Sequence, residues 1–117
     1  MKKLIILGAG TGGTIMANKL AGPLRRRGWK ITIVDRDDNH YYQPGFLLVP
    51  FGLYQPEDLV RRRSALLPGD VEFITKEVEE IKPEKKAIKL ADGEELGYDL
   101  LLIATGNHIC PEETPGL

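Results

Sequence analysis

The sequence predicts an α/β fold, in which helices pack against a parallel β-sheet. Residues 4–7 (LIIL) form a short continuous apolar run, which is typical of a strand buried on both faces of such a sheet. Apolar residues follow at helical spacing between about Thr11 and Arg27, and a second run, Ile31–Val34, consists of β-branched residues throughout. This order predicts a strand, a helix and a second parallel strand at the start of the chain.

The remaining elements follow from local signals. Arg25–Arg27 place cations near the end of the first helix and Gly28 favours its termination, while Gly22-Pro23 predicts a kink or an earlier end. Residues 43–54 are apolar but contain Gly and Pro, which indicates an ordered loop. A second helix is predicted over residues 55–67, because Pro and acidic residues occupy its first turn. Three further strands are predicted at Val71–Ile81, Ala87–Leu90 and Tyr98–Ala104.

Length and composition limit the possible functions. The 117 residues, of which 42% are hydrophobic and 28% charged, predict a single folded domain that covers residues 1–117. A net charge of −1 provides no electrostatic basis for binding nucleic acid or an anionic membrane surface. One cysteine cannot form an internal disulfide, and no apolar run approaches the ~18 residues of a membrane span, so we expect a cytoplasmic protein. His40, His108 and Cys110 do not form a metal-binding pattern.

A glycine-rich turn follows the first predicted strand. Residues 8–13 (GAGTGG) match G-x-G-x-x-G between a strand and a helix, the context in which this motif binds a dinucleotide. In that function Gly8 forms the tight turn, Gly10 lets the backbone approach a pyrophosphate, and Gly13 lets the helix pack close to the strand. The N–H groups at the start of the helix provide partial positive charge for the phosphates. A glycine-rich turn without a ligand is the alternative interpretation.

Asp35 ends the second predicted strand, 22 residues after Gly13. A carboxylate at this position accepts hydrogen bonds from both hydroxyls of an adenosine ribose and disfavours a cofactor that carries a 2′-phosphate. The alternative is an exposed turn acid within the charged segment of residues 35–38. Because NAD and FAD share the adenosine diphosphate half, these features alone do not separate the two cofactors.

A second motif lies near the C-terminal end of the chain. Residues 98–106 (YDLLLIATG) resemble the YDxLxxATG signature of the two-dinucleotide-binding flavoproteins in the pyridine nucleotide-disulfide oxidoreductase superfamily. The resemblance extends to the glycine-rich turn, Asp35 and an Asp-Gly hairpin at residues 92–93. It implies a Rossmann-like FAD/NAD(P)-binding fold, with a parallel sheet, helices and a three-stranded antiparallel meander, and it implies FAD as the cofactor.

The resemblance also assigns binding roles to individual residues. For most of them a purely structural role is the alternative, such as a core valine at position 78 or a small-residue turn after the last strand. The implied contacts are Gly8, Gly10, Thr11, Gly12 and Gly13 around the pyrophosphate, Asp35 at the ribose, the backbone of Val78 near the adenine, and Ala104, Thr105 and Gly106 on the flavin side. No catalytic residue is assigned.

Within the superfamily the sequence is most similar to sulfide:quinone oxidoreductases, with type II NADH dehydrogenases as near relatives. Residues 39–52 lack the C-x4-C disulfide of the glutathione-reductase type and form an aromatic, Pro-containing loop instead. The resemblance implies electron transfer from sulfide or NADH to FAD and on to a quinone. Sulfide oxidation needs thiols beside the flavin, and Cys110 is interpreted as a free surface or packing thiol. A small NAD-binding enzyme and a non-catalytic domain that self-associates remain open as alternatives.

The resemblance also carries expectations about the whole protein. In these enzymes a second dinucleotide-binding domain follows the Ala-Thr-Gly strand, so we expect an N-terminal part of a longer oxidoreductase, associated peripherally with a membrane at full length. The apolar loop of residues 45–54 is expected to be covered in a homo-oligomer. Arg61–Arg63 are interpreted as a solvated face, with an anion site as the alternative. Four further side chains are interpreted as loop anchors, with quinone or flavin contact as the alternative: His40, Tyr41, Tyr42 and Tyr54.

Overall fold

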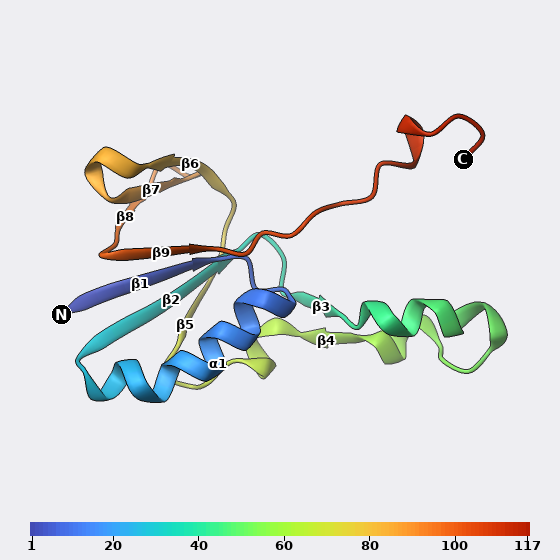
Figure 1. The fold of residues 1–117 in the computed structure, drawn as a ribbon, viewed down its shortest axis with the longest axis horizontal. Coiled ribbons are helices and arrows are strands. Elements are labelled where there is room, and N and C mark those ends of the chain that lie inside the picture. The colour runs from blue at the N-terminus through green and yellow to red at the C-terminus, as the bar shows by residue number, and fades with distance from the viewer.

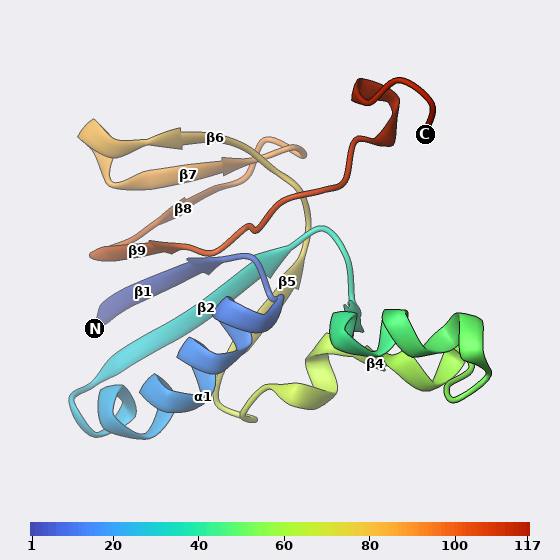
Figure 2. The same ribbon diagram turned by 45° about the vertical axis from the view of Figure 1, so that its right-hand side comes forward.

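A four-stranded parallel sheet lies at the centre of the computed structural model, which describes all 117 residues (Figure 1). The strand order is β5-β2-β1-β9, and every neighbouring pair is parallel. The strands are β1 (Lys2–Leu7), β2 (Trp29–Asp35), β5 (Glu72–Thr75) and β9 (Leu100–Ile103). The helix α1 (Thr11–Arg26) connects β1 to β2 and lies along the sheet (Figures 1 and 2).

A three-stranded antiparallel sheet packs on the other face of the parallel sheet. Its order is β6-β7-β8, and in Figure 2 it lies on the far side of β1 and β9 from α1. The strands are β6 (Val78–Lys82), β7 (Ala87–Leu90) and β8 (Glu95–Gly97), and the single 3₁₀ turn η4 (Pro83–Lys85) joins the first two. The predicted α/β fold with a parallel sheet and an antiparallel meander is therefore confirmed.

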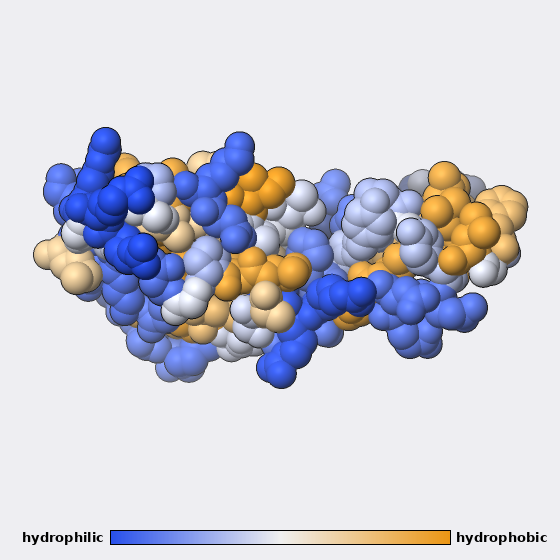
Figure 3. Space-filling view, turned by 90° about the horizontal axis from the view of Figure 1, so that it is seen from below, coloured by the Kyte–Doolittle hydropathy of each residue, from blue (hydrophilic) through white to orange (hydrophobic).

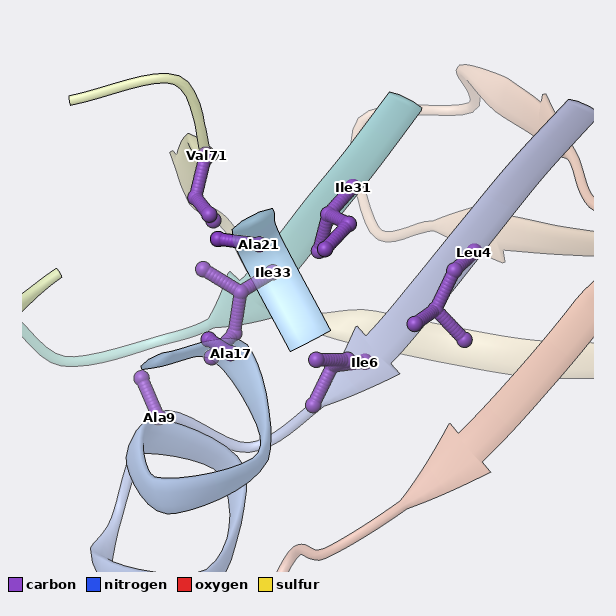
Figure 4. Packing of buried hydrophobic residues seen from close by; sticks show 8 residues of the cluster. All are labelled: Leu4, Ile6, Ala9, Ala17, Ala21, Ile31, Ile33 and Val71. Carbon is purple, nitrogen blue, oxygen red and sulfur yellow. The ribbon is translucent and has the colours of Figure 1, made fainter. Parts of the chain in front are cut away.

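Two apolar cores lie on opposite faces of the parallel sheet, because successive residues of a strand point to opposite sides. The core on the α1 side contains Leu4, Ile6, Ala9, Ala17, Ala21, Ile31, Ile33 and Val71 (Figure 4). The core on the meander side contains Ile5, Leu7, Val34, Ile88 and Leu90. Both faces of β1 are thus buried, which explains its continuous apolar run. The small side chains at 17 and 21 let the helix backbone lie close to the sheet.

The first helix ends at Arg26, two residues before the predicted stop at Gly28, and not at the proline within it. The helix passes through Gly22-Pro23 without interruption to Arg26, so an early end was the wrong prediction. Gly28 follows with a φ of +73°, and its N–H donates to the carbonyl oxygen of Arg25 at 3.0 Å. This left-handed position satisfies carbonyl groups at the helix C-terminus, as glycine commonly does.

The strand prediction needs two corrections. The predicted strand 71–81 is two strands, β5 and β6, because the chain leaves the parallel sheet at Lys76–Glu77 and enters the meander. The carbonyl oxygen of Glu77 at this crossing accepts the N–H of Ala91 at 2.9 Å. The predicted strand 98–104 is shorter at both ends, and the short strand β8 before it was not predicted. The apolar pattern of residues 71–81 does not show where the chain leaves one sheet and enters the other.

Residues 39–66, which we call the arm, extend away from the sheet (Figures 1 and 2). The predicted helix 55–67 is wrong, and the predicted loop 43–54 contains a 3₁₀ helix. The antiparallel strands β3 and β4 pair at the base of the arm. Because residues 60–62 belong to this pairing, only the single helical turn of residues 56–59 forms before them. The elements are β3 (Asn39–Tyr41), η1 (Gln43–Phe51), η2 (Pro56–Leu59), β4 (Val60–Arg62) and η3 (Arg63–Leu66).

The C-terminal segment leaves the end of β9 in an extended path that includes one 3₁₀ turn, η5 (Pro111–Glu113) (Figure 1). Across the whole structure, no helix is both long enough and apolar enough to cross a membrane.

Candidate nucleotide-binding site

The turn between β1 and α1 has the geometry that its glycines require. Gly8 has a φ of +95°, and its N–H donates to the carbonyl oxygen of Val34 at 2.8 Å. A Cβ at Gly8 would lie 2.3 Å from the carbonyl oxygen of Ala104 and 3.0 Å from the Cα of Thr105. The end of β9 therefore lies directly against this turn, and a side chain at position 8 would separate the two.

Gly13 brings the first turn of α1 close to β1. A Cβ at this position would lie 1.7 Å from the carbonyl oxygen of Gly8 and 3.3 Å from the Cγ2 of Ile6. Gly10 differs, because a Cβ there would meet no atom within 4 Å. The space beside Gly10 is therefore open to a ligand, whereas the space beside Gly13 is filled by the protein itself.

The N-terminus of α1 is suited to an anion. It has no acidic residue in its first turn and no side chain that caps it. The first N–H groups of a helix have no intrahelical partners, and here they belong to Thr11, Gly12 and Gly13. Thr11 and Gly12 are exposed. A phosphate group at this position would receive N–H hydrogen bonds and the favourable end of the helix dipole.

A cavity of about 260 Å³ opens beside this turn, at the carboxyl ends of β1 and β2. Ligands of α/β proteins bind at this edge of the sheet. The cavity is lined by Leu7, Gly8, Val34, Asp35, Arg36, Lys76, Glu77, Val78 and Thr105. Four of the residues predicted from the sequence therefore share one cavity, although they lie as much as 97 positions apart. The other predicted residues do not line this cavity: Gly10 is the N-cap of α1, residues 11–13 form its first turn, and 104 and 106 flank Thr105 in the sequence.

Asp35 is held by three donors at the end of β2. Its Oδ2 accepts the N–H of Ala9 at 2.8 Å and also an Nη1 hydrogen of Arg63. Its Oδ1 accepts the N–H of Asp37 at 3.0 Å. The side chain is 14% exposed, so Asp35 is not the solvated turn acid of the alternative interpretation.

Sequence reasoning assigned Arg63 wrongly. The interpretation of residues 61–63 as a solvated face fails for Arg63, whose side chain is 13% exposed, whereas that of Arg62 is 78% exposed. The Nε of Arg63 also donates to the carbonyl oxygen of Asn39 at 2.6 Å. The only signal in the sequence was three adjacent arginines, which does not indicate which of them faces the protein.

Two cations on the cavity wall were also not predicted, namely Arg36 and Lys76. The Nζ of Lys76 lies 2.7 Å from a carboxylate oxygen of Asp92 and 2.9 Å from one of Glu94. These hydrogen bonds raise the pKa of Lys76 to about 12, so the amine stays charged at physiological pH. The cavity lining therefore carries two cations, Arg36 and Lys76, and two carboxylates, Asp35 and Glu77.

A second, apolar cavity of about 410 Å³ lies in the arm. Among the side chains interpreted as loop anchors, only Tyr41 lines it, and His40 has a buried Nδ1 without a hydrogen-bond partner. The lining residues are Tyr41, Phe46, Val49, Pro50, Pro56, Leu59 and Val60. Cys110 is a free, half-buried thiol, and no group of three or more His, Cys, Asp or Glu side chains is placed to hold a metal.

The amino-acid sequence of this chain matches a family model and several characterised oxidoreductases. The family model described as pyridine nucleotide-disulphide oxidoreductase matches residues 2–117. The mitochondrial sulfide:quinone oxidoreductases of Dictyostelium discoideum and Mus musculus are 31% and 33% identical, each over 98% of this chain and 25% of the relative. A type II NADH:quinone oxidoreductase of Staphylococcus haemolyticus is 30% identical over 90% of this chain and 26% of that protein.

Solved structures agree with the sequence comparison. The X-ray structure of the sulfide:quinone oxidoreductase from Aquifex aeolicus matches with a TM-score of 0.80 and 25% identity, over 94% of this chain and 25% of that one. The chain thus spans about a quarter of the length of the relatives it matches.

Proposed function

The chain belongs to the pyridine nucleotide-disulphide oxidoreductase family, and from this premise we propose that it forms the FAD-binding segment of a flavin-dependent oxidoreductase. The observation that carries the proposal is the cavity at the carboxyl ends of β1 and β2, which Gly8, Asp35, Val78 and Thr105 share. It lies beside an uncapped helix N-terminus and open space at Gly10. Together these features fit an adenosine diphosphate group.

Each part of the site has a defined task in this proposal. The backbone at Gly10 and the N–H groups of residues 11–13 bind the pyrophosphate, and Asp35 accepts a hydrogen bond from the ribose. The backbone of Val78 lies beside the adenine, and residues 104–106 lie toward the flavin. When bound, FAD supplies two-electron redox chemistry.

We further propose the electron path that the relatives' names suggest, from sulfide or NADH to FAD and on to a quinone. The apolar cavity of the arm supports a lipophilic acceptor near this chain, because its lining residues include five hydrophobic side chains. The path is that of the full-length relatives, of whose length this chain spans about a quarter.

We also propose that the chain is a homo-oligomer in which the exposed apolar residues of the arm are covered. Phe46, Leu47, Phe51 and Leu53 are between 49% and 75% exposed, and they form an apolar surface at the far end of the arm (Figure 3). Apolar surfaces of this kind usually mark interfaces.

Calorimetric titration of the chain with ADP and with 2′-phospho-ADP tests the cofactor assignment. We expect ADP to bind at least about tenfold more tightly, because the Asp35 carboxylate repels a 2′-phosphate at close range. Reconstitution with FAD should give a yellow protein. Equal affinity for the two nucleotides would remove Asp35 from the ribose site, and quenching by NADH without any flavin binding would favour the small NAD-binding enzyme.

A further inference from the structure

The hydrogen-bonding capacity of Asp35 is almost fully used within the protein. A carboxylate has about four lone-pair positions, two on each oxygen. The Oδ2 of Asp35 accepts the N–H of Ala9 and a guanidinium hydrogen of Arg63, which fills both of its positions. The Oδ1 accepts the N–H of Asp37. One position therefore remains, on Oδ1, whereas a ribose that donated both hydroxyls would need two.

Arg63 is held in place by the rest of the structure. Its Nε donates to the carbonyl oxygen of Asn39 at 2.6 Å, and its backbone N–H donates to the carbonyl oxygen of Asp38 at 2.7 Å. The side chain is 13% exposed and does not line the cavity beside Asp35. Because the guanidinium lies outside the cavity wall and has a second partner, a nucleotide in the cavity does not displace it directly.

We propose that Arg63 is a positioning residue that restricts Asp35 to a single hydrogen bond with the ribose of the bound nucleotide. By occupying Oδ2, it leaves Oδ1 as the acceptor for one of the two hydroxyls, and the other hydroxyl makes no hydrogen bond to this carboxylate. The inference rests on the proposed function, in which an adenosine ribose binds at Asp35. It differs from the two-hydroxyl contact that the sequence alone predicts.

Titration with ADP, 2′-deoxy-ADP and 3′-deoxy-ADP tests the inference on the unmodified chain. We expect one deoxy analogue to bind about tenfold more weakly than ADP, or about 1.4 kcal/mol, and the other to bind within about twofold of ADP. Comparable losses for both analogues would overturn the inference and leave the proposed function intact. Absence of ADP binding would contradict the proposed function itself.

The variant Arg63→Met separates positioning from a general structural role. It releases Oδ2 from the guanidinium, so the carboxylate is free to turn both oxygens toward the ribose, and both deoxy analogues should then bind about tenfold more weakly than ADP. Arg63→Lys, which can still donate to Oδ2, should retain the one-hydroxyl pattern of the unmodified chain. Uniform weakening of all three ligands in Arg63→Met would show a merely structural role and contradict the inference.

Arg61→Met is the matched control for these variants. The Arg61 guanidinium donates only to the carbonyl oxygens of Asp58 and Val60, within its own segment. This variant should bind all three ligands as the unmodified chain does. Circular dichroism tests whether each variant is folded. If Arg63→Met does not fold, the relative affinities of the unmodified chain and of Arg63→Lys for ADP and its two deoxy analogues still test the inference.

Discussion

At the scale of single residues, the glycines of the β1–α1 turn serve different purposes. Gly8 has a positive φ and contacts the end of β9, and Gly13 contacts the carbonyl oxygen of Gly8. Both are required by the protein's own packing. Gly10 has open space where its Cβ would be, so packing does not explain it. The proposed function gives it a role, because a pyrophosphate that approaches the backbone there would require a residue without a side chain.

Gly10→Val is therefore expected to abolish nucleotide binding while the fold remains. The added side chain would occupy the space that the pyrophosphate needs, and it would meet no protein atom at its Cβ. Calorimetry with ADP measures the first effect and circular dichroism the second. Gly69→Val is the control, since its Cβ also meets nothing within 4 Å and it lies away from the cavity. Unchanged ADP binding in a folded Gly10→Val would refute the phosphate-binding role.

Gly13→Ala should instead reduce stability, by about 2–4 kcal/mol of unfolding free energy. The new Cβ would lie 1.7 Å from a backbone oxygen, so α1 and β1 would have to separate. Urea denaturation measures the change. Gly12→Ala is the matched control, because its Cβ would lie 3.6 Å from that of Ala104, an ordinary contact, and its midpoint should shift little. Similar midpoints for the two variants would contradict the close approach of α1 to β1.

At the scale of elements, the arm shows how local signals and tertiary contacts compete. The signals for a helix start at residue 55 are present, since Asp58 accepts the N–H of Gln55 at 3.0 Å in a capping box. The turn nevertheless ends at Leu59, because residues 60–62 pair with β3. Asp38 secures the base of the arm, with its Oδ1 accepting the N–H of Ser64 and its Oδ2 accepting the Nε of Arg62, each at 3.1 Å.

The Asp38 contacts make the attachment of the arm sensitive to acid. The N–H of Ser64, followed by the side chain of Arg62, lowers the pKa of Asp38 below its ordinary value of 3.8. For a carboxyl with a lowered folded pKa, the stabilisation is fully present above the unfolded pKa and is lost as the pH falls through the folded value. We expect Asp38→Asn to lower stability near neutral pH, with the difference from the unmodified chain being lost as the pH falls through the lowered folded pKa of Asp38.

Urea denaturation from pH 2 to 7, with hydrogen exchange of the Tyr42 N–H in the arm, measures this effect. Glu84→Gln is the control, because it removes an exposed carboxylate that forms no ion pair, and it should leave the pH profile unchanged. A stability difference between Asp38→Asn and the unmodified chain that stayed constant down to pH 2 would contradict the role of the ionised carboxylate.

At the scale of the whole molecule, the arm makes the chain elongated. The structure measures 50 × 32 × 19 Å and has a radius of gyration of 16.5 Å, against about 13 Å for a compact domain of this size. The difference arises because the arm lies beside the central sheet and not on it, and because the C-terminal segment extends away from the sheet (Figure 1). The arm therefore exposes apolar side chains that a compact domain of the same composition would bury.

We expect the purified chain to be a dimer or a higher oligomer, and the double variant Leu47→Asp/Phe51→Asp to be monomeric. The two side chains are 74% and 75% exposed, and charges there would oppose burial in an interface. Size-exclusion chromatography with light scattering measures both states. Ile109→Asp, at an 89% exposed position outside the arm, should remain oligomeric. A monomeric unmodified chain would contradict self-association through the arm.

The sequence by itself determined the β1–α1–β2 unit, its glycine-rich turn and the small-residue end of β9. These features are encoded locally, by an apolar run, a helical period and glycines whose spacing the backbone geometry requires. The meander followed from the resemblance to a family more than from periodicity, since its strands are short and partly exposed.

Only the tertiary structure decided the course of the arm and the partner of Asp35. Residues 60–62 have no intrinsic preference strong enough to show that they pair with residues 39–41, and this pairing converted a predicted helix into a strand. The same pairing brings Arg63 to Asp35, 28 positions away, whereas the side chains of Arg61 and Arg62 remain exposed. A contact of this kind depends on where two distant backbones meet, which neither composition nor spacing specifies.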